Sequence, residues 1–374
     1  MQSSSYSNKK GLVVRRPDGI RGVNEYLNNI TVNEWGRSSI DRFLINLSGT
    51  THDGNKLLEG SARAYAKLKM RNKKFRYLNG SSSESSSTTL KHLASIGFGI
   101  LKQELYTAVT STRDYLQAKN LRPHLVVTDD ALQDFAGINT MHPNVVVIGY
   151  APEKFNYETF AVCFQKIITM PGKHAKLIAI DMGRLRDTTQ RWCFENDQYE
   201  SVAAKNVLKT DQQCQKYEQD VYRAGADPDV GTGPFVKGLA HACLEDDITV
   251  VGKPSNEYYW NAMFSLGEEY PINCVVIGDD VDNDVIAAIN AGMHGCLVKT
   301  GKYRLGDENK LFTTGFPPVT LPVKDRCLVV DSVEEAIDKL TQAYYTVDSS
   351  KGEKGLPLKV EVWGREFEFY RVGN

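Results

Sequence analysis

The residues of this chain that could carry out chemistry follow three apolar runs. The polar loop Asn46–Thr50 follows Phe43–Ile45, Lys253 ends a second run, and Asp279–Asp284 follows a third. The last segment holds four aspartates in six residues, more than helix capping needs, because unpaired carboxylates repel one another. A bound cation is the simple way to hold such carboxylates together. The sequence therefore predicts a cation site in the neighbourhood of an amide and a lysine.

The elements that must position these residues read as strands alternating with helices. Phe43–Ile45 lacks the period-two alternation of a half-exposed strand, which indicates a strand covered on both faces. Further strands are predicted over 75–78, 125–128, 145–149, 177–180, 248–252, 274–278, 295–298 and 328–330. The alternation predicts a parallel α/β sheet. Ligands of such sheets bind beyond the carboxyl ends of the strands, where Asn46–Thr50 and Lys253 are expected.

Helical periodicity fills the intervals between the strands. It covers 56–71, 90–96, 131–135, 157–168, 235–242, 284–291 and 333–345. Pro254 suits the first position of a helix, because its missing N–H is not needed there. Gly231–Phe235 is a tight turn into a helix and matches neither a dinucleotide fingerprint nor a P-loop. Leu358–Trp363 and Glu366–Phe369 alternate strictly and predict a hairpin after the core.

The composition argues against several classes of protein. The 374 residues include 45 basic and 46 acidic side chains, so no field of one sign favours a nucleic acid or a membrane as partner. No apolar run approaches the roughly 20 residues that cross a membrane. The seven cysteines are scattered without a Cys-x-x-Cys pair, which argues against a zinc site or a disulfide framework and favours a reducing compartment.

Two segments differ in composition from the rest of the chain. Met1–Gly22 is rich in serine and basic residues and lacks the apolar core of a secretory signal. We expect a disordered tail on a cytoplasmic protein, with a mitochondrial transit peptide as the alternative. Trp192–Ala224 is polar and indicates an inserted helical excursion, which is either a solvated surface or a contact for a partner.

Six blocks of sequence carry a resemblance to a known superfamily. They are Arg42–His52, Arg122–Asn139, Asn144–Phe155, Val250–Pro254, Val276–Asp280 and Gly295–Tyr303. With these blocks the chain resembles, from about residue 42 to about residue 345, the haloacid dehalogenase superfamily, whose first motif is an apolar strand followed by Asp-x-Asp/Ser-Gly-Thr. The resemblance implies a doubly wound, mostly parallel α/β core with an inserted α/β cap of subclass IIA.

The resemblance also implies a division into domains. We expect a disordered tail over 1–32, core segments over 33–120 and 248–345, a cap over 121–247 with the insertion 192–224, and a tail with a hairpin over 346–374. Such caps close over the active site and choose the substrate, so Thr128–Asp130 and Gly149–Pro152 are candidate contacts from the cap. Relatives suggest a homodimer through the cap, although the insertion could block that surface.

The first and third motifs of the family assign roles to three residues. Asn46 stands at the position of the Asp nucleophile, which attacks a phosphoryl group. A carboxamide is a far poorer nucleophile, because its oxygen carries no charge and its lone pairs are delocalised. Ser48 stands at the general acid/base position, where a hydroxyl is a poor proton shuttle near neutral pH. Lys253 matches the lysine that neutralises the phosphate and pairs with the nucleophile.

The fourth and second motifs imply a metal site and a phosphate site. Asp279 and Asp284 match the acids that bind Mg²⁺, together with position 46 and the backbone carbonyl of Ser48, and Asp280 is a supporting neighbour. The family's Thr/Ser-Asn-Asn/Thr appears here as Asn79-Gly80-Ser81, so the phosphate-binding hydroxyl has moved or gone. Asn79, Gly80, Ser81 and Lys253 are the candidates for phosphate binding. Helix capping and a flexible loop are the alternative explanation of the serines.

Three functions are compatible with these residues. The first is a phosphatase-family protein with impaired catalysis that keeps a site for Mg²⁺ and for a phosphorylated small molecule or phosphoprotein. The second is an active Mg²⁺-dependent phosphohydrolase, of phosphoprotein, phosphoamino acid or pyrophosphate type, in which another group or a water attacks. Asp53 lies close in sequence, but nothing in the sequence brings it to the phosphorus. The third is an interaction module. We expect the first, because Asn46 removes the covalent nucleophile.

Overall fold

A computed structural model describes most of the chain between residues 40 and 369. The described residues are 40–170, 176–183, 185–186, 229–245, 247–313, 326–341, 358–362 and 365–369. The predicted N-terminal tail over 1–32 and the predicted insertion over 192–224 lie outside them.

Six parallel strands form the larger sheet, with β1 (Arg42–Asn46) inside it. The strand order is β14-β13-β12-β1-β4-β5. The other strands are β4 (Lys74–Asn79), β5 (Leu105–Thr107), β12 (Cys274–Gly278), β13 (His294–Val298) and β14 (Cys327–Val330). Because β1 lies between β12 and β4, its carboxyl end lies beside the ends of both. This arrangement confirms the predicted α/β fold.

Both faces of the larger sheet are buried, as the apolar run at β1 predicts. Leu44 packs on one face, and Phe43 and Ile45 pack on the other. The helices on the Leu44 face are α5 (Ala108–Ala118), α10 (Asn256–Ser265) and α11 (Ala287–Asn290). The helices on the opposite face are α3 (Ser61–Met70), α4 (Ser86–Ser95) and α13 (Val333–Thr341). Helices on both faces of the sheet therefore bury β1 in the interior.

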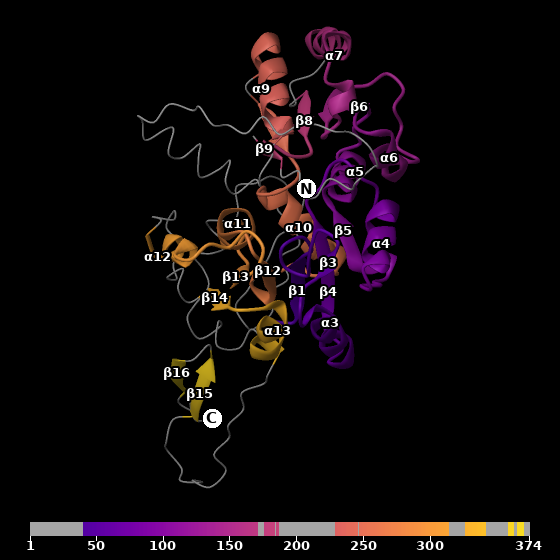
Figure 1. Cartoon of the computed structure of the whole chain (residues 1–374). Coiled ribbons are helices and arrows are strands. Elements are labelled where there is room, and N and C mark those ends of the chain that lie inside the picture. The colour runs from indigo at the N-terminus through magenta and orange to yellow at the C-terminus, as the bar shows by residue number, and fades with distance from the viewer. Residues whose placement is uncertain are drawn as a thin grey trace, which may run out of the picture.

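A smaller parallel sheet lies on the side of the molecule away from α3 and α13 (Figure 1). Its order is β11-β8-β7-β6, with β6 (Pro123–Val126), β7 (Val145–Ile148), β8 (Leu177–Ala179) and β11 (Ile248–Val250). Helices α7 (Tyr157–Thr169) and α9 (Thr232–Cys243) pack on one face. Val145, Val147 and Ile178 on the other face join the apolar cluster of Leu44. Residues of both sheets thus belong to the same hydrophobic core.

The boundary predicted between cap and second core segment needs correction. We expected the core to resume at residue 248, but Ile248 pairs with Leu177 and Val250 with Ala179, so β11 belongs to the smaller sheet. An apolar run of this length is typical of any buried parallel strand, so the sequence does not indicate which neighbouring strand it pairs with.

Three predicted helix starts are also wrong. The helix expected from Lys56 begins at Ser61, because the preceding residues form an antiparallel hairpin of β2 (His52–Asp53) and β3 (Lys56–Leu57). The helix expected from Asp284 begins earlier, with the π-helical turn η6 (Val281–Ile286). Pro254 precedes the helix instead of opening it, since Ser255 caps α10.

The remaining elements are short, and several were not predicted. The 3₁₀ turns and short helices are η1 (Lys102–Glu104), α6 (Asp129–Leu132), η2 (Gln133–Phe135), η3 (Pro152–Lys154), η5 (Pro271–Asn273), η7 (Asp307–Asn309) and α12 (Lys310–Thr313). Two antiparallel pairs are β9 (Leu185–Arg186) with β10 (Asp229–Val230), and β15 (Leu358–Val362) with β16 (Arg365–Phe369). The second pair is the predicted hairpin. Among the described helices, none is long and apolar enough to cross a membrane.

Candidate functional site

The candidate site lies at the carboxyl edge of the larger sheet. Asn46 is the last residue of β1, and Asp279 directly follows the neighbouring strand β12. The loop after β1 turns at Gly49, whose φ of +77° suits glycine. A Cβ atom on Gly49 would lie 2.0 Å from Oδ2 of Asp279, so no larger residue fits there without displacing the carboxylate. The predicted polar loop and the predicted aspartates therefore meet.

The Asn46 amide lies at the centre of the site. Its Nδ2 atom donates hydrogen bonds to the carbonyl oxygen of Ser48 at 2.9 Å, to Oδ1 of Asp279 at 2.9 Å and to Oδ2 of Asp284 at 3.3 Å. Its Oδ1 atom accepts a hydrogen bond from Nζ of Lys253 at 2.9 Å. The amide is thus a donor toward the acids and an acceptor toward the lysine.

Lys253 reaches Asn46 from the smaller sheet. It lies just beyond β11, and its Nζ atom is 2.6 Å from Oδ1 of Asp284. The Lys253 side chain is 14% exposed and that of Asp284 is 1% exposed, so this ion pair is buried. Removal of one partner of a buried pair leaves an uncompensated charge in the interior, which is strongly destabilising. The sequence placed Lys253 near Asn46 correctly, although its strand belongs to the other sheet.

Asp279 is a buried carboxylate with several donors. The Thr50 hydroxyl donates to its Oδ1 at 2.9 Å, and the backbone N–H of Lys302 donates to its Oδ2 at 2.9 Å. Burial and then the nearby charge of Asp284 raise the pKa of Asp279 to about 6, against the opposing effects of Lys302 and Thr50. We define Asn46, Lys253, Asp279 and Asp284 as the Asn46 cluster. It holds two neighbouring carboxylates, one ammonium group and one amide.

The other two aspartates of the run have different partners. Asp280 accepts hydrogen bonds from the backbone N–H groups of Asp282 at 3.1 Å and Asn283 at 3.0 Å, so it caps η6. Burial raises the pKa of Asp280, but the positive charge of Lys302 and the hydrogen bonds from Asn283 outweigh it, and the pKa is lowered. Asp282 forms an ion pair with Lys310 at 2.7 Å. Capping and a surface pair thus account for these two residues.

The arrangement does not fit the Mg²⁺ ion that the resemblance implies. Mg²⁺ takes oxygen ligands in octahedral geometry at about 2.0–2.1 Å. Between the oxygens of Ser48, Asp279 and Asp284 lies the Asn46 nitrogen, while the Asn46 side-chain oxygen faces Lys253. Over the described residues, no three His, Cys, Asp or Glu side chains are grouped to hold a metal ion. The predicted metal ligands form a hydrogen-bonded cluster instead.

The residues of the second motif divide between the site and helix α4. Gly80 lies beside Lys253, because a Cβ atom on Gly80 would be 3.6 Å from Cδ of the lysine. The Asn79 side chain turns away toward α4, and its Nδ2 donates to Glu84 just before that helix at 2.8 Å and to Thr89 within it at 3.0 Å. Its Oδ1 accepts a hydrogen bond from the backbone N–H of Ser81 at 2.9 Å. Asn79 therefore shapes the loop, and Gly80 is the part of the motif that borders Lys253.

The predicted cap contacts meet the serine-rich loop that leads into α4. The Thr128 hydroxyl donates to the carbonyl oxygen of Ser83 at 2.6 Å, and the backbone N–H of Tyr150 donates to Oγ of Ser82 at 2.9 Å. The Ser82 hydroxyl in turn donates to Asp181. Thr128–Asp130 and Gly149–Pro152 therefore contact the core at this loop.

Two carboxylates of the smaller domain bind the first turn of α4. Asp130 accepts the backbone N–H of Ser85 at 2.6 Å, and Asp134 accepts the N–H and the hydroxyl of Ser86, both at 2.7 Å. Negative charge is stabilised at a helix amino terminus, where N–H groups lack helical partners. We call these contacts the cap seam; it comprises Ser82, Ser83, Ser85 and Ser86 on one side and Thr128, Asp130, Asp134, Tyr150 and Asp181 on the other.

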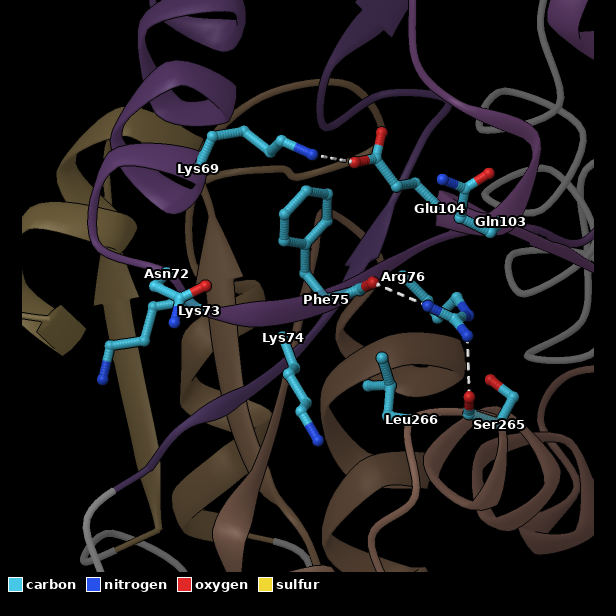
Figure 2. Close-up of a pocket in the computed structure, with 10 residues that line it drawn as sticks. All are labelled: Lys69, Asn72, Lys73, Lys74, Phe75, Arg76, Gln103, Glu104, Ser265 and Leu266. Carbon is cyan, nitrogen blue, oxygen red and sulfur yellow. Dashed lines mark hydrogen bonds and ion pairs between the residues drawn. The ribbon is translucent and has the colours of Figure 1, made fainter.

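A cavity of about 350 Å³ lies at the amino end of β4, at the opposite edge of the sheet from Asn46. Figure 2 shows that three of its charged side chains have protein partners: Lys69 pairs with Glu104 at 2.7 Å, and Arg76 donates to the carbonyl oxygens of Phe75 at 3.2 Å and Ser265 at 2.7 Å. None of the predicted site residues lines this cavity. It is separate from the candidate site.

Sequence reasoning missed several residues of the site and its border. Thr50 lay within the predicted polar loop without a role of its own. Lys302 and Thr300, whose hydroxyl donates to the carbonyl oxygen of Gly49 at 2.5 Å, come from the loop after β13. The signal that could have found them is the block Gly295–Tyr303, which carries the family resemblance.

Comparisons with known proteins agree with this architecture. A haloacid dehalogenase-like hydrolase model matches residues 43–139, and a HAD-hydrolase-like model matches residues 250–336. Haloacid dehalogenase-like hydrolase domain-containing protein 2 of Bos taurus is 34% identical over 275 residues, which cover 74% of this chain and 90% of that protein. The chain belongs to the haloacid dehalogenase-like hydrolase family.

Other similar proteins of the family include phosphatases. Phospholysine phosphohistidine inorganic pyrophosphate phosphatase of Homo sapiens is 28% identical over 316 residues, which cover 82% of this chain and 97% of that protein. The structure of p-nitrophenyl phosphatase from Archaeoglobus fulgidus matches 80% of this chain and 99% of its own with a TM-score of 0.59 at 18% identity. NagD from E. coli K-12 matches 79% and 98% with a TM-score of 0.58 at 16% identity. The structural likeness supports the fold, a haloacid dehalogenase-like core with a subclass IIA type of cap.

Proposed function

We propose that this member of the haloacid dehalogenase-like family is strongly impaired in phosphate hydrolysis and keeps a place for a phosphate group beside Lys253. The observation that carries the proposal is the amide at position 46, at the carboxyl end of β1. A carboxylate there would attack phosphorus and form an acyl phosphate. The Asn46 oxygen carries no charge, and the hydrogen bond from Lys253 withdraws further electron density from it.

The expected loss of activity is large. Removal of a nucleophile lowers kcat on the order of 10⁴- to 10⁶-fold, and the remaining acceleration comes from positioning and from charge stabilisation. In this chain the groups left for that purpose are the Lys253 ammonium and the neighbouring loop at Gly80 and Ser81. Asp53 does not offer a substitute nucleophile, because it lies exposed in β2, in the hairpin with β3.

The proposal assigns no step to Mg²⁺. Phosphatases of this family typically use that ion, and the Mg²⁺ site was part of the sequence-based prediction. Here Nδ2 of Asn46 lies between the oxygens of Ser48, Asp279 and Asp284 that would bind it.

Phosphorylated small molecules and phosphoamino acids of proteins are the ligand class that we propose. One relative is named for phospholysine, phosphohistidine and inorganic pyrophosphate, and a structural neighbour is named for p-nitrophenyl phosphate. These compounds share a terminal phosphoryl group of the size that a single lysine and a short loop can contact.

Restoration of the carboxylate tests the proposal. We expect the native chain to release phosphate from p-nitrophenyl phosphate and from phosphohistidine close to the background rate, with 10 mM Mg²⁺ present. Asn46→Asp should raise the rate by on the order of 10²-fold or more, because a covalent path becomes available. Recovery should be incomplete, since Asn79-Gly80-Ser81 also departs from the family motif.

The matched control is Asn139→Asp, the same change on an exposed residue, which should not raise the rate. Turnover by the native chain that Lys253→Ala abolishes would contradict the proposal. That result would indicate an active phosphohydrolase in which a water or another side chain attacks.

A further inference from the structure

The Asn46 amide lies among oxygen atoms that are suited to coordinate a cation. Three oxygens, from Ser48, Asp279 and Asp284, lie 2.9 to 3.3 Å from the single nitrogen Nδ2. Asp279 and Asp284 are each 1% exposed, so water does little to screen the repulsion between their carboxylates. When both acids are ionised, a positive or partly positive group between them is needed to offset their repulsion.

The orientation of this amide is fixed by its neighbours. Lys253 is a donor only, so the Asn46 atom that faces its ammonium must be the oxygen. The nitrogen then has to face the acids. The reverse orientation would place N–H groups against the ammonium and would place the carbonyl oxygen against both carboxylates. Four interactions thus select one orientation, and in it the Asn46 oxygen is directed away from the acids.

We propose that the Asn46 side chain takes the place of the divalent cation in this fold, so that the site is complete without a metal ion. The inference rests on the proposed function in one respect, the assignment of Asn46 to the nucleophile position. It deepens that proposal, because it makes the chain independent of Mg²⁺ as well as poor in hydrolysis.

The charge of the cluster supports the replacement. Lys253, Asp279 and Asp284 amount to a net charge of −1 when both acids are ionised, and Asn46 adds none. An aspartate at position 46 would add a third carboxylate at the same place and would create the need for a divalent cation. Binding of Mg²⁺ to the native chain would instead require the amide to leave, with loss of its hydrogen bonds to Lys253 and to the acids.

Thermal unfolding of three purified full-length proteins, each in 10 mM MgCl₂ and in 1 mM EDTA, tests the inference. The native chain should change its Tm by less than about 1 °C between the two conditions. Asn46→Asp should be less stable than the native chain in EDTA and should gain about 5 °C or more with Mg²⁺, as expected for a ligand far above its Kd. Asn139→Asp is the matched control and should behave like the native chain.

A second variant covers the case in which Asn46→Asp does not fold. Asn46→Ala removes the amide and leaves the oxygens of Ser48, Asp279 and Asp284 facing an emptied space. We expect a lower Tm than that of the native chain in EDTA and a gain of several degrees with Mg²⁺ or Mn²⁺. Asn139→Ala, with the same truncation at the surface, should show no gain.

Calorimetric titration with Mg²⁺ alone gives the outcome that would overturn the inference. Binding by the native chain within about 10-fold of the affinity of Asn46→Asp, and loss of that binding in Asp279→Asn, would mean that the amide yields to the metal. This result is separate from the test of catalysis. A native chain that binds Mg²⁺ but releases no phosphate would overturn the inference alone, and one that ignores Mg²⁺ but hydrolyses would overturn the proposed function alone.

Discussion

The Asn46 cluster and the cap seam balance the charges of their carboxylates in different ways. In the cluster, Asp284 is paired with a full positive charge on Lys253, and Asp279 is joined by neutral donors. In the seam, Asp130 and Asp134 are balanced by backbone N–H groups and hydroxyls at the start of α4, and no lysine or arginine of the described part of the chain forms an ion pair with them. The loss of a partner therefore leaves a bare charge in the cluster, and only an unmade hydrogen bond in the seam.

The Asn46 cluster and the serine-rich loop that leads into α4 share a property that the family motifs alone do not reveal. Polar groups that a phosphate or a metal would contact already have partners within the protein. The Asn46 amide is bonded to Lys253 and to the acids, and the Ser81 hydroxyl lies 3.1 Å from that of Ser83. A site that is satisfied in this way is stable without a ligand, and a ligand must displace existing hydrogen bonds in order to bind.

Removal of Lys253 should have the largest effect on stability. Lys253→Met keeps the aliphatic length and leaves Asp284 buried without its ion pair, which should cost about 3–5 kcal/mol and lower the Tm by about 10 °C. Lys299→Met is the matched control, because Lys299 is 41% exposed and pairs at 3.1 Å with Asp331, which is 79% exposed. It should cost less than about 1 kcal/mol. Equal losses in chemical denaturation would refute the contrast between cluster and surface.

Removal of both seam carboxylates should have an intermediate effect. Asp130→Ala combined with Asp134→Ala takes the acceptors from the first turn of α4, at about 1 kcal/mol each. Hydrogen exchange of the Ser85 and Ser86 amides should accelerate, while exchange in β1 should not. Asp129→Ala is the control, because Asp129 is 92% exposed and contacts Lys154 instead of α4. Unchanged exchange at Ser85 and Ser86 in the double variant would show that the seam does not hold this helix end.

The smallest effect is expected at Ser82. Ser82→Ala removes the hydroxyl that joins Asp181 to the backbone N–H of Tyr150, and it should cost about 1 kcal/mol, or roughly 2–4 °C in Tm. Ser95→Ala is the matched control at an exposed serine that bonds within its own helix. If both variants melt together with the native chain, the Ser82 contact adds nothing to the attachment of the smaller domain.

A large part of the architecture could be predicted because it depends on local pattern. The uninterrupted apolar runs that became β1, β7 and β12 are buried on both faces, and their composition requires such a setting. The short β5 and the helix α5 were not predicted, because Leu105–Thr107 is too brief to show a period. Pairing partners were also beyond reach, as β11 illustrates: its sequence suits either sheet, and only contact with β8 decides between them.

The sequence predicted most of the residues that form the site, but not the hydrogen bonds that they make. Asn46, Asp279 and Asp284 were identified because they follow buried parallel strands, whose carboxyl ends lie at one edge of the larger sheet. Lys253 follows a strand of the smaller sheet, and its role was assigned from its match to the third motif of the family. Asn79 was expected to face the phosphate, but its amide donates to Glu84 in the loop before α4 and to Thr89 on α4. A polar side chain selects the partners that satisfy its donors and acceptors, and these partners come from other elements.

The sequence by itself determined that Asn46 and Asp279 lie at the carboxyl edge of the larger sheet, because local runs of apolar side chains identify the buried strands that precede them. Only the tertiary structure decided that the Asn46 nitrogen faces two acids and its oxygen faces a lysine. The two acids lie 233 and 238 positions from Asn46 along the chain, and the lysine lies 207 positions away. The direction of an amide depends on which of its neighbours donate and which accept, and folding alone brings those neighbours together.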